Sequence, residues 1–225
     1  SPGFENFTTL DSFLGKTKKL DFLKLKLIEK KITIKDALED ISHKHNYLEE
    51  ADYLFNNPKS RYQEIMRVQS SKVFNHITTR HKKTKILKFK QLNQGEKVSN
   101  KHRLGYRLTQ KRMAGNEISR TITSCNDDFI HYSQPRIITI REMARLQSFP
   151  DHYQFQGTPT TGSDRRRENV CQVQQVANAV PPFLALAVAE AVSFMLKRKS
   201  NMVYSKIIDF LNNKSQKIPP RIQTS

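Results

Sequence analysis

A chain of 225 residues has room for one large domain or two small ones. Its formal charge of +18 at pH 7 is clustered, which favours a nucleic-acid partner over a merely soluble basic surface. Cys125 and Cys171 form no CxxC pair, so we expect no metal site, no disulfide framework and a reducing, cytoplasmic location. No signal sequence is visible, and no apolar run reaches the ~20 residues of a membrane span.

The first clear helix signal follows a segment, residues 1–32, whose apolar spacing fits helix and strand equally well. Thr33 and Asp36 stand at the spacing of a capping box, in which each side chain accepts a backbone N–H of the other residue. Apolar residues then recur at helical intervals as far as Ile41. The pattern predicts a helix over 33–41 with one buried face.

Residues 61–120 form a strongly basic region, with sixteen Lys or Arg against three acidic residues. Within it, the alternation in TKILKFKQL (84–92) predicts a half-buried strand, and ISRTITS (118–124) predicts a second one. Polar loops with Gly and Asn separate these pieces. We therefore expect a small, loop-rich unit here.

A second capped helix is predicted after residue 139, where Thr139 and Glu142 repeat the capping-box spacing and Pro150 ends the segment. Its apolar face is expected to contain Ile140, Met143, Ala144 and Gln147.

A third helix, over 183–196, begins just after two prolines and contains only two residues that are not apolar, Glu190 and Ser193. A helix that is apolar nearly all round must be covered on several sides. We expect a partner structure to cover it, and the alternative is an ordinary core helix at the end of a domain.

Two phrases near the end of the chain resemble conserved motifs of the DNA (cytosine-5) methyltransferases. TIREMARLQSFPDHYQF (139–155) resembles the ninth motif, R-E-x-x-R-L-Q-x-F-P-D, and VANAVPPFLALAVAEAV (176–192) resembles the tenth, G-N-A-V-P-P followed by a helix. Upstream, residues 116–142 are similar to the end of the family's target recognition domain, with its Thr-Ile pair at Thr121 and Ile122. The resemblance covers about residues 33–196.

The resemblance implies an α+β chain, with a small basic strand-and-loop recognition domain and helices that complete a Rossmann-like S-adenosylmethionine-dependent methyltransferase domain. It implies four parts: a connecting segment (1–32), the target recognition domain (33–135), a segment with the ninth and tenth motifs that packs on the catalytic domain (136–196), and a basic tail (197–225).

Enzymes of that family flip a cytosine out of the duplex, attack it with a thiolate from a Pro-Cys motif and methylate it from S-adenosyl-L-methionine. Neither cysteine here follows a proline, and both are interpreted as small buried hydrophobes. The letters Glu-Asn-Val at 168–170 lie between the two motifs, where the catalytic Glu-Asn-Val of the family does not occur. The sequence therefore lacks the family's catalytic motifs.

We predict the DNA-recognition and C-terminal part of a restriction-modification cytosine-5 methyltransferase. It would be inactive alone, would bind double-stranded DNA and would need a catalytic half as partner. The alternatives are a non-catalytic, sequence-specific DNA-binding protein derived from this scaffold and, less favoured, an RNA-directed relative.

Candidate site residues follow from the same resemblance and from side-chain chemistry. Arg141, Glu142 and Arg145 are expected to brace the recognition domain against the catalytic one. Asn178 and Ala179 are expected at the methionine end of the cofactor; if the family's Gly at position 177 needs a positive φ, Ala177 costs about 1 kcal/mol. The side chains expected to contact DNA are Arg107, Lys111, Arg112, Asn116, Arg120, Thr121, Thr123 and Ser124.

Overall fold

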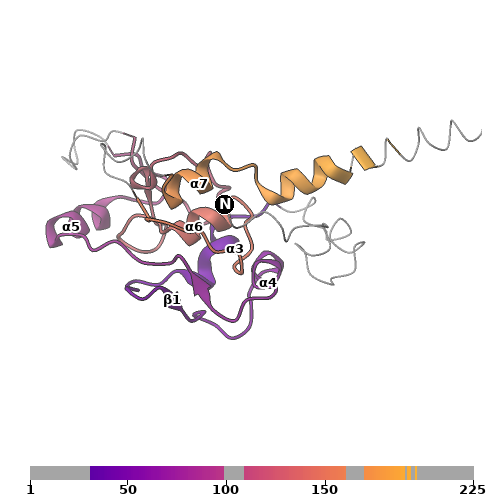
Figure 1. Ribbon diagram of the computed structural model, residues 1–225. Helices are drawn as coiled ribbons and strands as arrows, with labels where there is room; N and C mark the ends of the chain where they lie inside the picture. Colours follow the sequence, from indigo (N-terminus) through magenta and orange to yellow (C-terminus); the bar gives the residue numbers. More distant parts are fainter. Residues whose placement is uncertain (1–30, 99–108, 161–169, 191, 194–195, 197–225) are drawn as a thin grey trace, which may run out of the picture. The chain divides into compact units, whose positions relative to one another are not determined.

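A computed structural model of the chain describes residues 31–98, 109–160, 170–190, 192, 193 and 196. The chain divides into two compact units with the boundary between Ala179 and Val180. In the first unit, short helices and two-residue strands are joined by long loops (Figure 1). This mixture of helix and strand agrees with the expected α+β class.

The first unit contains five α-helices, two 3-10 helices and four strands within the described residues. β1 pairs antiparallel with β2, with Glu50 opposite Phe74, and β3 pairs parallel with β4, with Lys111 opposite Phe129. The helices are α3 (Ile34–Leu38), α4 (Arg61–Met66), α5 (Lys83–Gln91), α6 (Ile140–Leu146) and α7 (Gln172–Asn178), with 3-10 turns η1 (Glu39–Ile41) and η3 (Asn126–Asp128). The strands are β1 (Glu50–Ala51), β2 (Val73–Phe74), β3 (Lys111–Arg112) and β4 (Phe129–Ile130).

The helix prediction for 33–41 is confirmed by α3 and the 3-10 turn that follows it. The Thr33 hydroxyl accepts the Asp36 N–H at 3.1 Å, and the Asp36 carboxylate accepts the Thr33 N–H at 3.0 Å. Ile34, Leu38 and Ile41 are buried. The capping box and the apolar stripe therefore set both the start and the orientation of this helix.

The helix after Thr139 is also confirmed, and it is the centre of the unit. α6 contacts α3 and α7, and it lies between them in Figure 1. Its capping box is complete, because Thr139 caps the N–H of Glu142 and Glu142 accepts the N–H of Thr139. The helix ends at Leu146, before Pro150, as the sequence indicated.

The two predicted strands in the basic region are wrong. Residues 83–91 form the helix α5, and residues 118–124 have no regular secondary structure. Phe89 and Leu92, three residues apart, are both buried in a core cluster with Val98, Ile130 and Ile137. The short apolar pattern fits the repeat of a helix as well as that of a strand. Packing of Phe89 and Leu92 in this cluster requires the helix.

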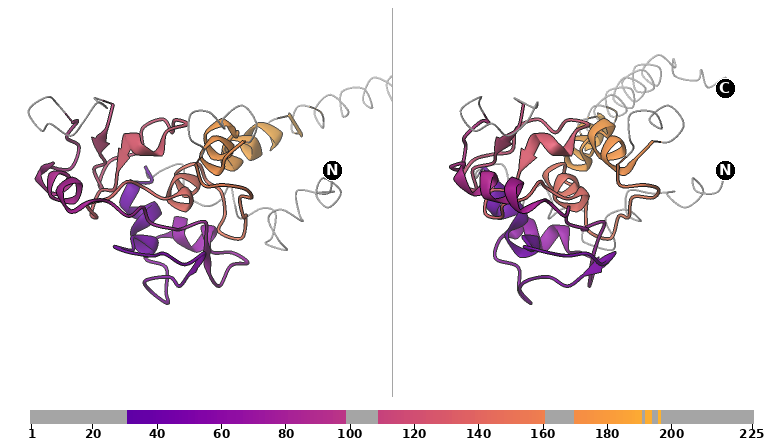
Figure 2. Two further views of the ribbon diagram at one scale, coloured as in Figure 1. Left: turned by 60° about the vertical axis from the view of Figure 1, so that its left-hand side comes forward. Right: turned by 90° about the vertical axis from the view of Figure 1, so that its left-hand side faces the viewer.

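Helix α7 was not predicted, because its sequence QVQQVAN is mostly polar. Val173, Val176 and Gln172 are buried, so three residues on one face hold it in place. The turned views of Figure 2 show α7 beside α6 from two further directions.

The second unit contains a helix that begins at residue 182, directly after Pro181, and whose described residues are helical at 182–190, 192, 193 and 196. The Ala185 N–H donates to the Pro181 carbonyl at 3.0 Å, which closes the first turn. The helix predicted for 183–196 is thus confirmed where the structure describes it. Among the described residues, no helix combines the length and the apolar character needed to cross a membrane.

Candidate DNA interface and its buried charged support

Helix α6 carries three charged side chains that are completely buried, Arg141, Glu142 and Arg145. The sequence pattern placed only the apolar face of this helix in the core. Burying an isolated charge costs far more than a small domain can offset, so each of these groups needs partners inside the protein. The structure supplies those partners from segments on both sides of α6.

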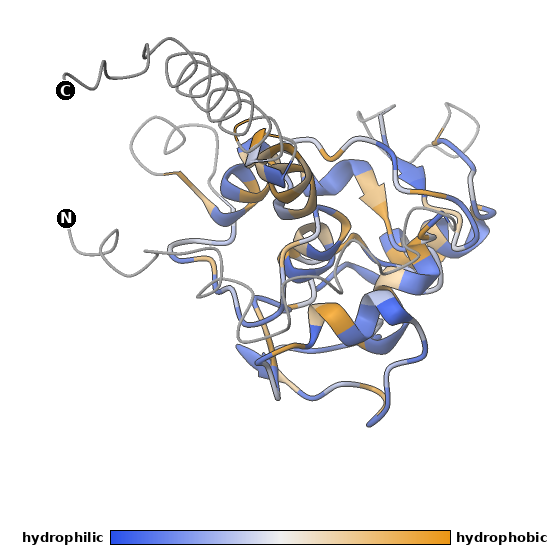
Figure 3. Cartoon of the chain, turned by 90° about the vertical axis from the view of Figure 1, so that its right-hand side faces the viewer, coloured by the Kyte–Doolittle hydropathy of each residue, from blue (hydrophilic) through white to orange (hydrophobic). Residues whose placement is uncertain are grey.

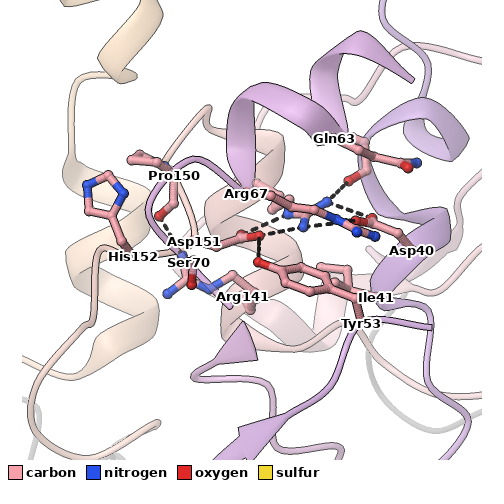
Figure 4. A network of polar contacts seen from close by, with 12 residues as sticks. Asp40, Ile41, Tyr53, Gln63, Arg67, Ser70, Arg141, Pro150, Asp151 and His152 are labelled. Carbon is pink, nitrogen blue, oxygen red and sulfur yellow. Dashed lines mark hydrogen bonds and ion pairs between the residues drawn. The ribbon is translucent and has the colours of Figure 1, made fainter. Parts of the chain in front are cut away.

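Arg145 pairs with two carboxylates, Asp40 and Asp151, which are both labelled in Figure 4. Its guanidinium donates to Asp40 at 2.7 and 3.2 Å and to Asp151 at 2.9 and 2.5 Å. A remaining donor reaches the Ala37 carbonyl at 2.9 Å. This bidentate geometry is the strongest arrangement available to an Arg–carboxylate pair, and it ties α6 to the end of α3 and to the loop after Pro150.

Both carboxylates have further partners, so the cluster extends beyond Arg145. Arg67 donates to Asp40 at 2.8 Å, and the Tyr53 hydroxyl donates to Asp151 at 2.7 Å. Burial raises the pKa of Asp151, but the adjacent Arg145 outweighs this and holds the pKa below its ordinary value. Burial and the neighbouring Asp151 raise the pKa of Tyr53, which keeps its hydroxyl protonated as a donor.

Arg141 binds backbone rather than carboxylates. Its guanidinium donates to the carbonyls of Phe74 at 2.9 Å and Pro150 at 3.0 Å, and also to the carbonyl of Tyr153. Burial lowers the pKa of Arg141 to about 10, which still leaves it charged at neutral pH. Arg141 therefore fixes β2 and the 150–153 segment to the same helix.

Glu142 forms a buried ion pair with Arg136. Arg136 donates to its two oxygens at 2.8 and 2.6 Å, and the Thr139 N–H donates at 2.9 Å. Burial raises the pKa of Glu142, but Arg136 outweighs it and the pKa lies below its ordinary value. The carboxylate therefore stays charged throughout the physiological range.

Two buried histidines complete this cluster in neutral form. His76 bonds the Thr139 hydroxyl at 2.9 Å, and His131 lies 3.4 Å from Glu142. Burial lowers the pKa of both His76 and His131 to about 3. Sequence reasoning missed these histidines, together with Asp40 and Arg136; the one available signal was that charges on a buried helix require partners.

The predicted DNA contacts occupy β3 and the irregular segment that follows it. The exposed members are Asn116, Arg120, Thr121 and Ser124, whereas Lys111 and Thr123 are half-buried. Arg107 lies outside the described residues, as do the first two residues of the Glu-Asn-Val stretch at 168–170.

Arg112 is engaged within the fold. Its guanidinium donates to the carbonyls of Leu92 at 2.7 Å, Phe89 at 3.3 Å and Tyr132 at 3.3 Å. It therefore closes the carboxyl end of α5 against β3. A base contact predicted for Arg112 would have to break these bonds.

The exposed loop of residues 115–124 is held at its base. The Ile34 N–H donates to the Glu117 carbonyl at 2.9 Å, and the Lys35 N–H donates to the Gly115 carbonyl at 2.8 Å. A Cβ added to Gly115 would lie 2.8 Å from Cδ2 of Tyr132, so this position requires glycine for close approach. α3 therefore determines where the predicted base-reading side chains begin.

Asp128 holds the other end of the loop. Its two oxygens accept the hydroxyls of Thr109 at 2.6 Å and Thr123 at 3.3 Å. The Arg120 guanidinium lies over the ring of Phe129, 4.7 Å from the centroid, and also donates to the Thr109 carbonyl at 3.3 Å. These contacts leave exposed polar side chains on an anchored loop, the arrangement that direct readout of bases requires.

The two residues expected at the cofactor end the helix α7. Asn178 is exposed at its last position, and Ala179 follows with an extended backbone (φ −75°, ψ 146°). Ala177 lies inside α7 and is not among the described residues with positive φ, so the strain considered for it does not arise.

Each cysteine stands directly before a helix of the first unit. Cys171 is buried at the N-cap of α7, and Cys125 is half-buried before η3. Among the described residues, no group of His, Cys, Asp and Glu could hold a metal ion.

In the second unit, an exposed apolar stripe with intervals of four residues begins at Val180, just before the helix, and continues along the helix to Leu196. We call it the C-terminal stripe. Figure 3 shows the described turns of this helix coloured largely as hydrophobic. Its members and their exposed fractions are Val180 (64%), Leu184 (55%), Val188 (55%), Val192 (49%) and Leu196 (63%).

Comparison with known proteins gives consistent results. The profile of the C-5 cytosine-specific DNA methylase family matches residues 6–193. The chain is 35% identical over 186 residues to the Type II methyltransferase M.DdeI of Desulfomicrobium norvegicum, covering 75% of this chain and 42% of the relative. It is 39% identical over 133 residues to the Type II methyltransferase M.AquIB of a Picosynechococcus strain, covering 58% of this chain and 95% of that relative.

A solved structure shares the fold. It is the crystal structure of a candidate DNA modification methyltransferase encoded within an E. coli prophage, with a TM-score of 0.56 and 21% identity. The alignment covers 75% of this chain and 48% of that one. The chain thus spans less than half of M.DdeI and of this structure, and nearly all of M.AquIB.

Proposed function

This chain belongs to the C-5 cytosine-specific DNA methylase family, and from that premise we propose that it is the DNA-recognition and C-terminal part of a restriction-modification cytosine-5 methyltransferase. It would bind a specific duplex sequence so that a catalytic part methylates a flipped cytosine. That catalytic part, whether in the same protein or in a separate chain, would supply the Pro-Cys thiolate that these residues lack.

The observation that carries the proposal is the C-terminal stripe. Its five apolar residues are exposed, and an exposed stripe of this kind favours contact with another protein body. The extent of the matches supports the same conclusion, because the chain corresponds to a minor part of a long methyltransferase and to almost all of a short one.

In this proposal, α6 supports the recognition loop from within. Arg145, Arg141 and Glu142 would not contact DNA, because all three are completely buried and bound to groups of this chain. They would instead fix the position of α3 relative to the segment that precedes α6. The loop of residues 115–124 is bonded to α3 and leads into that segment. The base contacts would come from Asn116, Arg120, Thr121, Thr123 and Ser124, with Arg107 and Lys111 as further candidates.

The cofactor would be held mainly by the catalytic part. When bound, S-adenosylmethionine supplies the methyl group. The amide of Asn178 and the backbone of Ala179 would reach the methionine end, because both stand at the exposed end of α7.

The test uses the full chain alone and in a chimera. Selection from a random duplex pool would show whether the chain binds a preferred sequence, and transfer of labelled methyl groups would measure activity. We expect sequence-selective binding with no methyl transfer by the chain alone. We expect transfer when the chain replaces its matching segment in M.DdeI.

Methyl transfer by the chain alone would contradict the proposal. Specific DNA binding without activity in any chimera would favour the alternative, a non-catalytic DNA-binding protein.

A further inference from the structure

Two segments distant in sequence, residues 44–47 and 78–83, meet at the surface of the first unit. Asn46 joins them: its N–H donates to the Thr78 hydroxyl at 2.9 Å, and its carbonyl accepts the Thr78 N–H at 2.7 Å. Its side-chain amide donates to the His76 carbonyl at 3.0 Å. Because Asn46 and Thr78 are buried, the junction is held by contacts in the interior of the unit.

This junction presents an exposed aromatic ring with a cation on its face. Tyr47 is 45% exposed, and the Arg80 guanidinium carbon lies 4.3 Å from its ring centroid. The His45 ring stacks beside it, with centroids 6.1 Å apart. A guanidinium placed flat on a ring keeps its N–H groups directed sideways, where an anion can accept them.

The segment that follows is fixed by His81. The Ile137 N–H donates to its Nε2 at 3.3 Å, and its ring packs edge-on against Phe89 at 5.3 Å. Arg80 and Lys82 on either side of it are exposed. The cations therefore project from an anchored backbone, which lowers the conformational entropy lost on binding.

The segment of residues 78–83 lies in a stretch of the sequence that has no carboxylates. Between Glu64 and Glu96 the chain has eight Lys or Arg and no Asp or Glu. Within the described residues, Arg80, Lys82 and Lys83 form no ion pair, whereas Lys35 and Lys59 pair with Glu39 and Lys72 pairs with Asp52. Unpaired like charges repel one another, so the arrangement favours a polyanion. Helix α5 lies at the edge of the unit in Figure 1 and in the left view of Figure 2.

We propose that this surface binds the phosphate backbone of duplex DNA and supplies affinity without sequence choice. The inference rests on the proposed function and adds a second contact region to the loop of residues 115–124. Phosphate contacts position a protein on DNA and carry no direct sequence information. We call it the Arg80 surface; its residues are Lys44, His45, Tyr47, Arg80, Lys82 and Lys83.

The experiment is a salt titration of DNA binding by the full chain. In a triple variant, Arg80→Gln, Lys82→Gln and Lys83→Gln remove three exposed cations that form no ion pair among the described residues. We expect at least tenfold weaker binding of a labelled 20-base-pair duplex, equally for cognate and unrelated sequences. The slope of log K against log salt should fall by roughly 0.9 for each lost phosphate contact.

A matched control removes the same charge elsewhere, with Lys35→Gln, Lys59→Gln and Lys72→Gln. These lysines already pair with carboxylates, so we expect little change in the salt slope. Thermal melting of both variants verifies that each retains the wild-type fold. Arg80→Lys keeps the charge and loses the ring contact, and it should retain most of the slope.

The outcomes separate the two proposals. Equal losses of slope in both triple variants would overturn the Arg80 surface and leave DNA binding standing. Absence of DNA binding by the wild-type chain at low salt would overturn the proposed function itself.

Discussion

Basic side chains serve two different purposes in two regions of this molecule. Around α6, the buried guanidinium of Arg145 is neutralised by Asp40 and Asp151. At α5, the exposed Lys82 and Lys83 have no acidic partner among the described residues. The presence or absence of carboxylates thus separates cations that hold the fold together from cations available to a partner. The net charge of the sequence cannot make that distinction.

The largest expected effect is the loss of Arg145. Arg145→Met leaves Asp40 and Asp151 buried with one cation fewer, and uncompensated buried charge costs about 3–5 kcal/mol in unfolding free energy. Urea denaturation followed by circular dichroism measures the change. Lys83→Gln is the control and should shift the midpoint very little, because that lysine is exposed and forms no ion pair with any residue that the structure describes. Equal shifts in the two variants would remove the distinction between the regions.

The buried histidines give the next effect, a pH dependence of stability. Their pKa of about 3 in the folded chain lies below the ordinary 6.5, so the unfolded chain binds more protons between these values. The stability they contribute is complete above pH 6.5 and is lost as the pH falls toward 3. The unfolding free energy should fall by up to about 1.4 kcal/mol per pH unit for each histidine.

A double variant isolates this contribution. His76→Gln with His131→Gln removes both titrating groups, so the slope of stability against pH between 6.5 and 4 should become shallower than in the wild type. An unchanged slope would mean that carboxylates alone account for the acid sensitivity.

The sequence predicted the parts of the fold that have local causes. The capping boxes at Thr33 and Thr139 each satisfy backbone donors within four residues, so α3 and α6 begin where the sequence predicts. α5 was assigned as a strand because nine residues fit both periods, and the choice depended on Ile130 and Ile137, some forty residues away. α7 has no local signal, since contacts to other parts of the unit hold its polar sequence.

The candidate site shows the same division. The ninth motif identified Arg141, Glu142 and Arg145, but their partners Asp40 and Arg136 lie outside that motif. Arg112 was chosen for its chemistry, yet its donors are bound to backbone carbonyls of α5. Only three-dimensional proximity separates such a residue from Arg120, which has the same chemistry at an exposed position.

A smaller effect is expected where the loop of residues 115–124 leaves the core. Gly115→Ala places a Cβ 2.8 Å from the Tyr132 ring, so the ring or the loop must move. Overpacking of this kind costs about 1–3 kcal/mol, measured as a lower denaturation midpoint. If the loop reads bases, sequence selectivity should fall more than total DNA affinity. Gly157→Ala, where an added Cβ meets nothing within 4 Å, compares the strain of a positive φ without a clash.

The smallest effect distinguishes helix stability from function at α5. Its N-cap is Lys82, which makes no capping hydrogen bond, and its first turn contains no acidic residue. Lys82→Asp would provide a cap and a favourable charge for the helix dipole, so the unfolding free energy should rise by about 0.5–1 kcal/mol. The same change places a carboxylate in the Arg80 surface, so DNA binding should weaken and its salt slope should fall. A variant that is both more stable and a weaker DNA binder would show that Lys82 serves a partner at some cost to its own helix. Gains in both properties would instead assign the lysine no role in binding.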